Sequence, residues 1–255
     1  MKELLRVEGI TKSFGKIVAL SNVSTSIYNN EIVGLVGDNG AGKSTLIKII
    51  SGVYGPDKGK IYYKGKLVQL KSVQDAMRLG IETIYQDHSV VPSLTVSQNI
   101  YLAREIYRKI PLFKGISIKF NDTKKMNEES KLLLDAIGIN ISPTSIVEDL
   151  SGGERQSVAF SRTRIGRIEL LLLDEPTASL SIGETERVIN YIIESKKEIS
   201  SVFVTHNPYL MFPVCDRFVV LGKGRKIADV KKENITQQEL IKLITTGKAN
   251  NTQQQ

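Results

Sequence analysis

A glycine-rich segment lies between two apolar runs, and it restricts the fold of this chain more than any other feature. The apolar run 32–36 before it is typical of a buried strand, and the run 46–50 after it has helical spacing. In such a strand–loop–helix unit, backbone N–H groups wrap around phosphates and the helix dipole favours an anion. The segment therefore predicts a phosphate-binding loop, with an ordinary glycine-rich turn as the alternative. It fits the spacing G-x-x-x-x-G-K-[ST] and consists of Gly37, Asp38, Asn39, Gly40, Ala41, Gly42, Lys43, Ser44 and Thr45.

Length and patterning indicate an α/β architecture. The chain has 255 residues, 41% of them hydrophobic, which is enough for one large domain or for one domain with an insertion. Strand-like and helix-like segments alternate, as expected for a parallel sheet with crossover helices. The first 30 residues and the stretch 60–70 instead predict short strands of an antiparallel side sheet. Residues 87–151 become helical, so we predict a helical insertion; within it, residues 104–125 are irregular and basic and fit neither pattern.

Several helix ends are predicted by their end signals. A helix over 128–137 should be closed by Gly138. The last residues, 250–255, have no apolar anchor and are expected to be disordered. Four pairs fit the capping box, in which a hydroxyl and a carboxylate or amide satisfy backbone donors: Thr95 with Gln98, Ser151 with Glu154, Ser181 with Glu184, and Thr236 with Glu239.

Composition argues against several classes of protein. No apolar stretch approaches the roughly 20 residues that cross a bilayer, and the charged start is not typical of a signal peptide. The single cysteine, Cys215, cannot form an internal disulfide, which fits a reducing cytosol, and its apolar surroundings favour buried packing over chemistry. The net charge of +8 is spread in ones and twos. We interpret it as a solvated surface rather than a nucleic-acid or membrane-binding patch.

A second chemical element follows four consecutive leucines at 170–173. Such a run is typical of a strand that is buried on both faces in a parallel sheet. Asp174 and Glu175 come directly after it, at the edge where open α/β sheets bind ligands. Asp174 is placed to hold Mg²⁺ together with the Ser44 hydroxyl, and Glu175 to act as general base toward water. An acidic pair that merely caps a helix is the alternative.

A third element, Leu150-Ser151-Gly152-Gly153-Glu154, makes the sequence similar to one particular family. Over residues 5–243 the chain resembles the ATP-binding-cassette (ABC) ATPases, the engines of ABC transporters. The resemblance implies that Ser151, Gly152 and Gly153 open a helix whose N-terminus meets the γ-phosphate of ATP held by the opposite subunit. Ser151 and Glu154 can also simply cap that helix.

The family resemblance also implies a fold. We expect a P-loop NTPase core of mostly parallel sheet flanked by helices, with an antiparallel β side sheet. This core would comprise residues 1–86 and 152–245. Residues 87–151 would form an inserted helical subdomain that ends in the signature motif, and residues 246–255 a disordered tail.

Further site residues follow from the resemblance alone. Phe14 matches the aromatic residue that stacks on adenine, although a lone Phe can also belong to the core. Gln86 matches the glutamine that reaches Mg²⁺ and water, and His206 the histidine that contacts the γ-phosphate. Ser181 stands where the family usually has an aspartate bridging two subunits, which puts coupling between the two ATP sites in doubt.

The resemblance implies a head-to-tail pair of cassettes that binds two ATP with Mg²⁺, as a homodimer or with a separate cassette. Lys43, Gln86, Glu175 and His206 would carry hydrolysis, and Ser44, Gln86 and Asp174 would hold the metal. The helical subdomain would meet integral membrane permease subunits, with an extracytoplasmic solute-binding protein acting indirectly. The chain would then be cytoplasmic and peripheral on the inner face of the membrane, with no nucleic-acid partner.

The segments 37–46, 84–87 and 94–100 are most similar to the carbohydrate-uptake branch, which handles monosaccharides. Importers of branched amino acids are the nearest rival within transport. A soluble cassette that acts on nucleic acid or the ribosome is the rival from another class. A nucleotide-binding regulator without turnover is disfavoured by the presence of Glu175 and His206.

Overall fold

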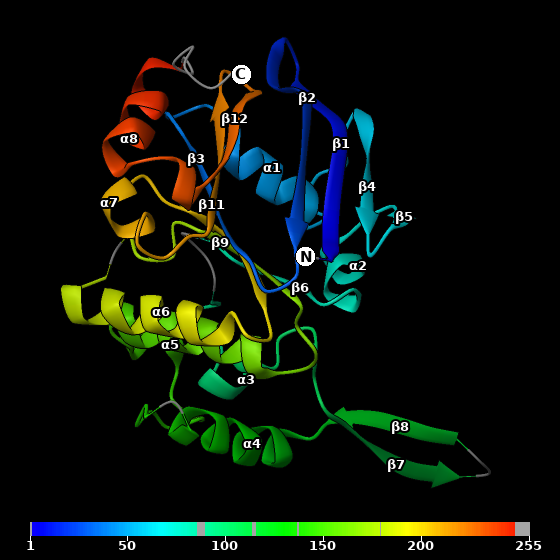
Figure 1. The fold of residues 1–255 in the computed structure, drawn as a ribbon. Coiled ribbons are helices and arrows are strands. Elements are labelled where there is room, and N and C mark those ends of the chain that lie inside the picture. The colour runs from blue at the N-terminus through cyan, green and yellow to red at the C-terminus, as the bar shows by residue number, and fades with distance from the viewer. Residues whose placement is uncertain (1, 86–89, 114–115, 137, 179, 248–255) are drawn as a thin grey trace. The chain divides into compact units, whose positions relative to one another are not determined.

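The computed structural model describes residues 2–85, 90–113, 116–136, 138–178 and 180–247. These residues form two compact units. The first contains the described residues within 1–86, 168–178 and 182–255, and the second contains those within 87–167 and 179–181. Figure 1 shows the elements of both units, coloured in chain order from blue to red.

A mixed sheet of six strands forms the centre of the first unit (Figure 1). All neighbouring strands are parallel except the edge strand β12, which runs antiparallel to β11. Every residue of β9 and β10 is buried, as expected for strands with both faces covered. The strand order is β12 (Arg225–Lys231), β11 (Arg217–Gly222), β3 (Ile32–Gly37), β10 (Ser200–Val204), β9 (Leu170–Asp174) and β6 (Ile81–Ile84).

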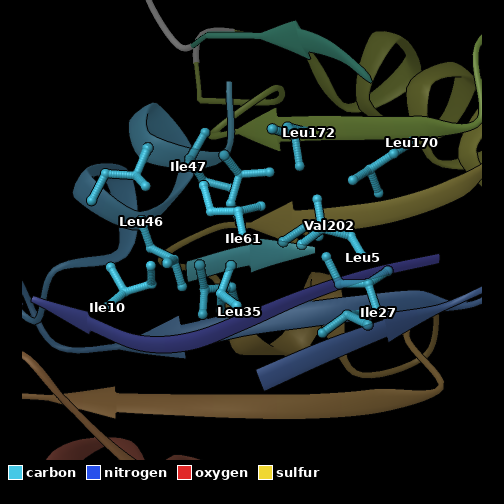
Figure 2. Close-up of a cluster of buried hydrophobic side chains, with 14 of the residues drawn as sticks. Leu5, Ile10, Ile27, Leu35, Leu46, Ile47, Ile61, Leu170, Leu172 and Val202 are labelled. Atoms are coloured by element: carbon cyan, nitrogen blue, oxygen red, sulfur yellow. The ribbon is translucent and has the colours of Figure 1, made fainter. Parts of the chain in front are cut away.

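The second sheet of this unit has four antiparallel strands, which confirms the predicted side sheet. Helix α1 (Lys43–Ile50) contributes Leu46 and Ile47 to the core that both sheets share (Figure 2). In that core, Leu172 of β9 and Leu5 of β1 come from the two different sheets. The helix that follows the glycine-rich loop is therefore fixed from two sides. The strand order is β2 (Ile17–Tyr28), β1 (Glu3–Phe14), β4 (Lys58–Tyr63) and β5 (Lys66–Val68).

On the face of the mixed sheet opposite the shared core, β3 requires a glycine at position 34. A Cβ there would lie 2.6 Å from Met211 Sδ and 2.8 Å from the Phe218 ring, so neither neighbour could remain in place. Cys215 is buried, which confirms its predicted packing role. The remaining helices of the unit are α2 (Val73–Arg78), α6 (Ile182–Ser195), α7 (Pro208–Met211), α8 (Gln237–Thr246) and the 3₁₀ turn η3 (Lys232–Asn234).

The second unit has its own small core. Val96 and Ile100 of α3, Met126 and Leu134 of α4, and Val158 of α5 are all buried in it. Among the described residues, no helix of the chain is long and apolar enough to span a bilayer. The elements of this unit are α3 (Val96–Ile100), β7 (Tyr107–Phe113), β8 (Ile116–Asn121), α4 (Thr123–Ala136), η1 (Val147–Asp149), α5 (Gly152–Ser161) and η2 (Arg162–Arg164).

Several details differ from the sequence-based expectation. The second unit extends to residue 167 rather than ending at 151, because Val158 of α5 packs in its core. Residues 107–113 and 116–121, which fitted no pattern, form the paired strands β7 and β8 of a hairpin. Helix α4 begins at Thr123 instead of 128. Residues 248–255 of the expected tail lie outside the described residues, whereas α8 continues to Thr246.

Three of the four predicted capping boxes are present. They begin α3 at Thr95, α5 at Ser151 and α8 at Thr236. In each, the hydroxyl accepts from the backbone N–H three residues on, and that residue's side chain accepts from the cap backbone. The pair Ser181 and Glu184 remains a prediction.

Candidate functional site

The glycine-rich loop connects the end of β3 to the start of α1, and two of its glycines are required by close approaches. A Cβ at Gly37 (φ +151°) would lie 2.2 Å from the Leu221 carbonyl oxygen. A Cβ at Gly42 (φ +100°) would lie 2.7 Å from the Ala19 carbonyl oxygen. Gly42 is the N-cap of α1 and supplies no side-chain hydrogen bond to the helix. The first amides of α1 therefore have no side-chain cap, which suits an anion at the helix start.

Lys43 lies folded over this loop. Its Nζ donates to the carbonyl oxygens of Gly37 (2.8 Å) and Asp38 (3.0 Å). Burial lowers the pKa of Lys43, while the charges of Glu175, Asp174 and Asp38 act in the opposite direction. A desolvated ammonium held only by carbonyls would gain by exchanging them for the oxygens of a phosphate.

Ser44 and Asp174 come together from two different elements. The Ser44 hydroxyl donates to Asp174 Oδ1 at 3.3 Å, across the gap between α1 and the end of β9. Burial raises the pKa of Asp174, although the Ser44 hydrogen bond and the positive charges of Lys48 and Lys43 lower it. A hydroxyl and a carboxylate side by side are the hard oxygen ligands that Mg²⁺ prefers, so this pair fits the predicted metal site.

Glu175 has an unusual backbone and a specific partner. Its φ is +52°, in the left-handed region that non-glycine residues seldom adopt. Its N–H donates to the Val204 carbonyl oxygen at 3.0 Å, which ties it to the end of β10. His206 Nδ1 lies 2.9 Å from Glu175 Oε2. The His206 side chain is 69% exposed and that of Glu175 only 12%, so this contact joins an exposed imidazole to a mostly buried carboxylate.

The structure thus brings five predicted residues together at the carboxyl edge of one sheet. Their strands are neighbours in register, because Val204 of β10 is paired with both Asp174 of β9 and Leu35 of β3. This is the edge at which open α/β sheets bind their ligands. The five residues are Lys43, Ser44, Asp174, Glu175 and His206.

Phe14 lies at the end of β1 in the same unit and is 42% exposed. Its ring packs edge-on against Tyr54, with 5.2 Å between centroids, and Lys12 Nζ lies 5.6 Å from the ring centre. A ring that is 42% exposed and supported at its edge is accessible from solvent, in contrast to the core position that was the alternative. Gln86 lies outside the described residues.

The predicted signature residues belong to the second unit. Ser151 caps α5 and donates, through both its N–H and its hydroxyl, to Glu154 Oε2 at 2.9 and 2.8 Å. Ser151 and Gly152 are exposed, whereas Gly153 is buried. The capping box therefore fixes the amides at the start of α5 while leaving that end of the helix open to solvent.

Two neighbours of the site were missed by sequence reasoning. Lys48 acts on the charge of Asp174, and its position four residues after Ser44, on the same face of α1, is the signal that could have identified it. Tyr54 supports Phe14, but its distance of 40 residues along the chain leaves no sequence signal.

Comparison with known proteins decides the family. The ABC transporter family matches residues 20–178, which is more than half of the chain. The chain belongs to the ABC transporter family. Because ATP-binding proteins of this family are ATPases, the chain is an ABC-type ATPase with the expected cassette fold.

Relatives and solved structures agree with this assignment. The xylose/arabinose import ATP-binding protein of Sulfolobus acidocaldarius is 44% identical over 98% of both chains. The fructose import ATP-binding protein of Rhizobium meliloti is 34% identical and covers 96% of this chain and 95% of its own. The crystal structure of the ADP conformation of an ATP-binding cassette of an ABC transporter superposes with a TM-score of 0.77, at 26% identity and 96% coverage of both chains.

Other relatives are longer. The ribose import ATP-binding protein of Caldanaerobacter subterraneus is 39% identical, and the match covers 96% of this chain but 48% of the relative. The chain thus spans about half the length of the ribose import proteins that it matches.

Proposed function

We propose that the chain is the ATP-hydrolysing subunit of an importer that takes up a monosaccharide through separate membrane subunits. The observation that carries the proposal is the assembly of Lys43, the Ser44–Asp174 pair and the Glu175–His206 pair at one sheet edge. These are the groups that phosphoryl transfer to water requires, because it depends on positioning and on neutralising phosphate charge rather than on covalent chemistry.

Each residue has a defined role in this proposal. Lys43 and the loop amides hold the β- and γ-phosphates, the ammonium leaving the carbonyls of Gly37 and Asp38 to do so. Glu175 accepts a proton from the attacking water as general base. His206 contacts the γ-phosphate and, through its hydrogen bond to Glu175, orients that carboxylate. The left-handed backbone of Glu175 is strain of the kind that is kept at functional sites, and it supports a preorganised base.

The metal would be held by Ser44 and Asp174, with Gln86 as a third predicted contact. Bound Mg²⁺ would neutralise charge on the phosphate oxygens. Phe14 would stack on the adenine. The phosphate-binding loop, the metal and the stacking ring would all contact the nucleotide from one protomer. One side of the γ-phosphate would then still need a partner from elsewhere.

A second cassette would supply that side. The start of α5, where Ser151 and Gly152 are exposed and the Ser151–Glu154 capping box fixes the backbone, is suited to receive a phosphate held by a facing subunit. We therefore propose a head-to-tail pair with two ATP molecules at the interface, formed by two copies or with a separate cassette. ATP closes the pair and hydrolysis releases it, which moves attached membrane subunits.

The relatives support the choice of cargo. Xylose/arabinose, ribose and fructose are the substrates in the names of the relatives described above. None of them is an amino-acid importer or a soluble nucleic-acid factor. The proposal includes permease subunits docked on the helical insertion, an extracytoplasmic binding protein that selects the sugar, and a location on the inner membrane face.

Reconstitution tests this function directly. The chain and its permease subunits are placed in proteoliposomes with ATP and Mg²⁺ trapped inside and the binding protein added outside, and uptake of labelled xylose, ribose, fructose and leucine into the vesicles is compared. We expect ATP-dependent uptake of one of the sugars, abolished by Glu175→Gln. Uptake of leucine instead would overturn the sugar assignment, and salt-sensitive binding of RNA or DNA in place of a permease would overturn transport.

A further inference from the structure

The hairpin of β7 and β8 is a two-stranded sheet with an apolar face and a basic face. Directly opposed residues in an antiparallel pair share a face, and residues two apart along a strand share it as well. Ile110 is opposite Ile118, and Arg108 is opposite Phe120, so these four lie on one face. Lys109 is opposite Lys119 on the other face.

The apolar face is exposed. The exposed fractions are 38% for Ile110, 41% for Ile118 and 48% for Phe120. The only strand that pairs with either β7 or β8, among the described residues, is the other strand of the hairpin. Isolated two-stranded hairpins are marginally stable in water, so leaving three large apolar side chains in solvent carries no benefit to the fold.

The basic face is equally unfavourable for the chain alone. Lys109 and Lys119 are both exposed and stand directly across from each other, an arrangement that repels. The sequence has no acidic residue between Glu105 and Asp122 to offset them. Lysines on sheet edges can serve to prevent strand-to-strand aggregation. That interpretation accounts for the lysines but not for the exposed Ile110, Ile118 and Phe120.

We propose that the β7–β8 hairpin docks on an anionic lipid surface, with Ile110, Ile118 and Phe120 in the interface and Arg108, Lys109 and Lys119 near the headgroups. Elements that lie in the membrane interface combine exposed aliphatic and aromatic residues with surrounding cations in this way. The charge is complementary to anionic headgroups, and a narrow two-stranded face requires no shaped pocket in its partner. The proposal does not depend on the cargo or on the transport assignment.

The test is flotation of the full-length chain with lipid vesicles. Vesicles of phosphatidylcholine alone are compared with vesicles of equal parts phosphatidylcholine and phosphatidylglycerol, at low and high salt. We expect binding to the anionic vesicles only, weakened by salt because the headgroup charges are then screened. The double variant Lys109→Gln/Lys119→Gln should bind about 30-fold more weakly, because each lysine near such a surface contributes about a fivefold gain in affinity and the two gains multiply.

A matched control removes the same charge from another hairpin. Lys60 of β4 and Lys66 of β5 are exposed, and Lys60→Gln/Lys66→Gln should leave vesicle binding within about twofold. For the apolar face, Ile118→Ser/Phe120→Ser should abolish flotation, whereas Ile17→Ser/Leu67→Ser, at positions 72% and 57% exposed, should not. Unchanged ATP turnover and circular dichroism show that all four variants are folded.

Three results would overturn the proposal. Equal binding to neutral and anionic vesicles would remove the electrostatic contribution, and equal effects of the hairpin and control variants would place the binding surface elsewhere. No binding to vesicles, together with binding of a synthetic acidic peptide that the Lys109/Lys119 variant loses, would make the hairpin a protein-docking element instead.

Discussion

The carboxyl edge of the mixed sheet and the start of α5 contrast in how they hold their polar groups. At the sheet edge, Lys43 and Asp174 are 9% and 7% exposed. Burial lowers the pKa of Lys43 and raises that of Asp174, which favours the neutral form of each. At the start of α5, Ser151 and Gly152 are exposed, and the polar groups there are held by a capping box that stabilises the helix. One region holds charges at the expense of stability, whereas the other holds amides that stabilise its own helix.

This difference indicates where the chemistry resides. Charges that are expensive to bury are kept where charge must be neutralised or developed in a reaction. Exposed, prearranged amides are useful only to a group that arrives from outside. The contrast therefore predicts that changes at the sheet edge alter catalysis in each protomer, while changes at α5 alter what one protomer does for another.

The largest expected effect is at Glu175. Glu175→Gln keeps the size and the left-handed backbone but removes the base, so turnover should fall by about 10² to 10⁴. Steady-state phosphate release measures this change, and ATP binding measured by equilibrium dialysis should persist. Glu169→Gln is the matched control at the start of the same strand, where Glu169 pairs with Lys64 away from the sheet edge. Turnover in Glu175→Gln equal to that in Glu169→Gln would remove Glu175 from its role.

A smaller effect is expected at Ser151. Ser151→Ala loses the helix cap and a donor to the facing phosphate. A hydrogen bond to a charged group contributes about 1.5–3 kcal/mol, which corresponds to about 10- to 150-fold in turnover. Thr236→Ala removes an equivalent capping box from α8 and should cost the same stability, about 1 kcal/mol, with turnover intact.

Dilution tests whether α5 acts on a facing protomer. If α5 acts on a facing protomer, turnover per chain should fall as the chain is diluted below its dimerisation constant, and Ser151→Ala should lower turnover without steepening that dependence. Turnover per chain that stays constant for a strictly monomeric preparation contradicts the head-to-tail proposal.

At the adenine end, Phe14→Ala should raise the dissociation constant for ATP about five- to tenfold, since stacking of a base on an exposed ring contributes upward of 1 kcal/mol. Phe14→Tyr retains a ring and should bind ATP as the parent does. Because Phe14 is 42% exposed, its loss should change the fold little, and thermal unfolding without nucleotide checks this. Equal affinities for the Ala and Tyr variants would return Phe14 to a packing role.

The sequence predicted the sheet edge well because its residues are local in the chain or follow recognisable strands. The loop 37–45 and the pair Asp174–Glu175 each come directly after a buried apolar run, and parallel strands bring such ends together. The capping boxes at Thr95, Ser151 and Thr236 were predictable for the same reason, since a cap depends on residues three apart.

What the sequence could not predict depends on contacts across long stretches of chain. The unit boundary near 167 is set by Val158 packing with Val96 and Ile100, which no local pattern encodes. The β7–β8 hairpin was missed because Ile110, Ile118 and Phe120 lie in solvent, so the usual link between alternation and burial gives a weak signal. The left-handed backbone of Glu175 is accompanied by a hydrogen bond to Val204, a residue 29 positions away that only the folded sheet brings near.

The smallest expected effect tests the cost of the charged sheet edge directly. Burial raises the pKa of Asp174 above its ordinary value of 3.8, so the folded chain favours the protonated carboxyl. The stability that this protonation provides is fully present below pH 3.8 and is lost as pH rises through the raised pKa. Asp174→Asn should therefore stabilise the nucleotide-free chain at neutral pH, by an amount on the order of 1 kcal/mol, or about 2–4 °C in melting temperature. The gain should shrink as pH falls.

Asp57 is the control for which we expect the opposite change in stability. Hydrogen bonds from Lys12 and Ser13 lower the pKa of Asp57, so Asp57→Asn should be less stable at neutral pH, and the loss should become smaller as pH falls. A neutral-pH loss of stability in both variants would mean that Asp174 supports the fold, and the contrast between a costly sheet edge and a self-stabilised helix start would not hold.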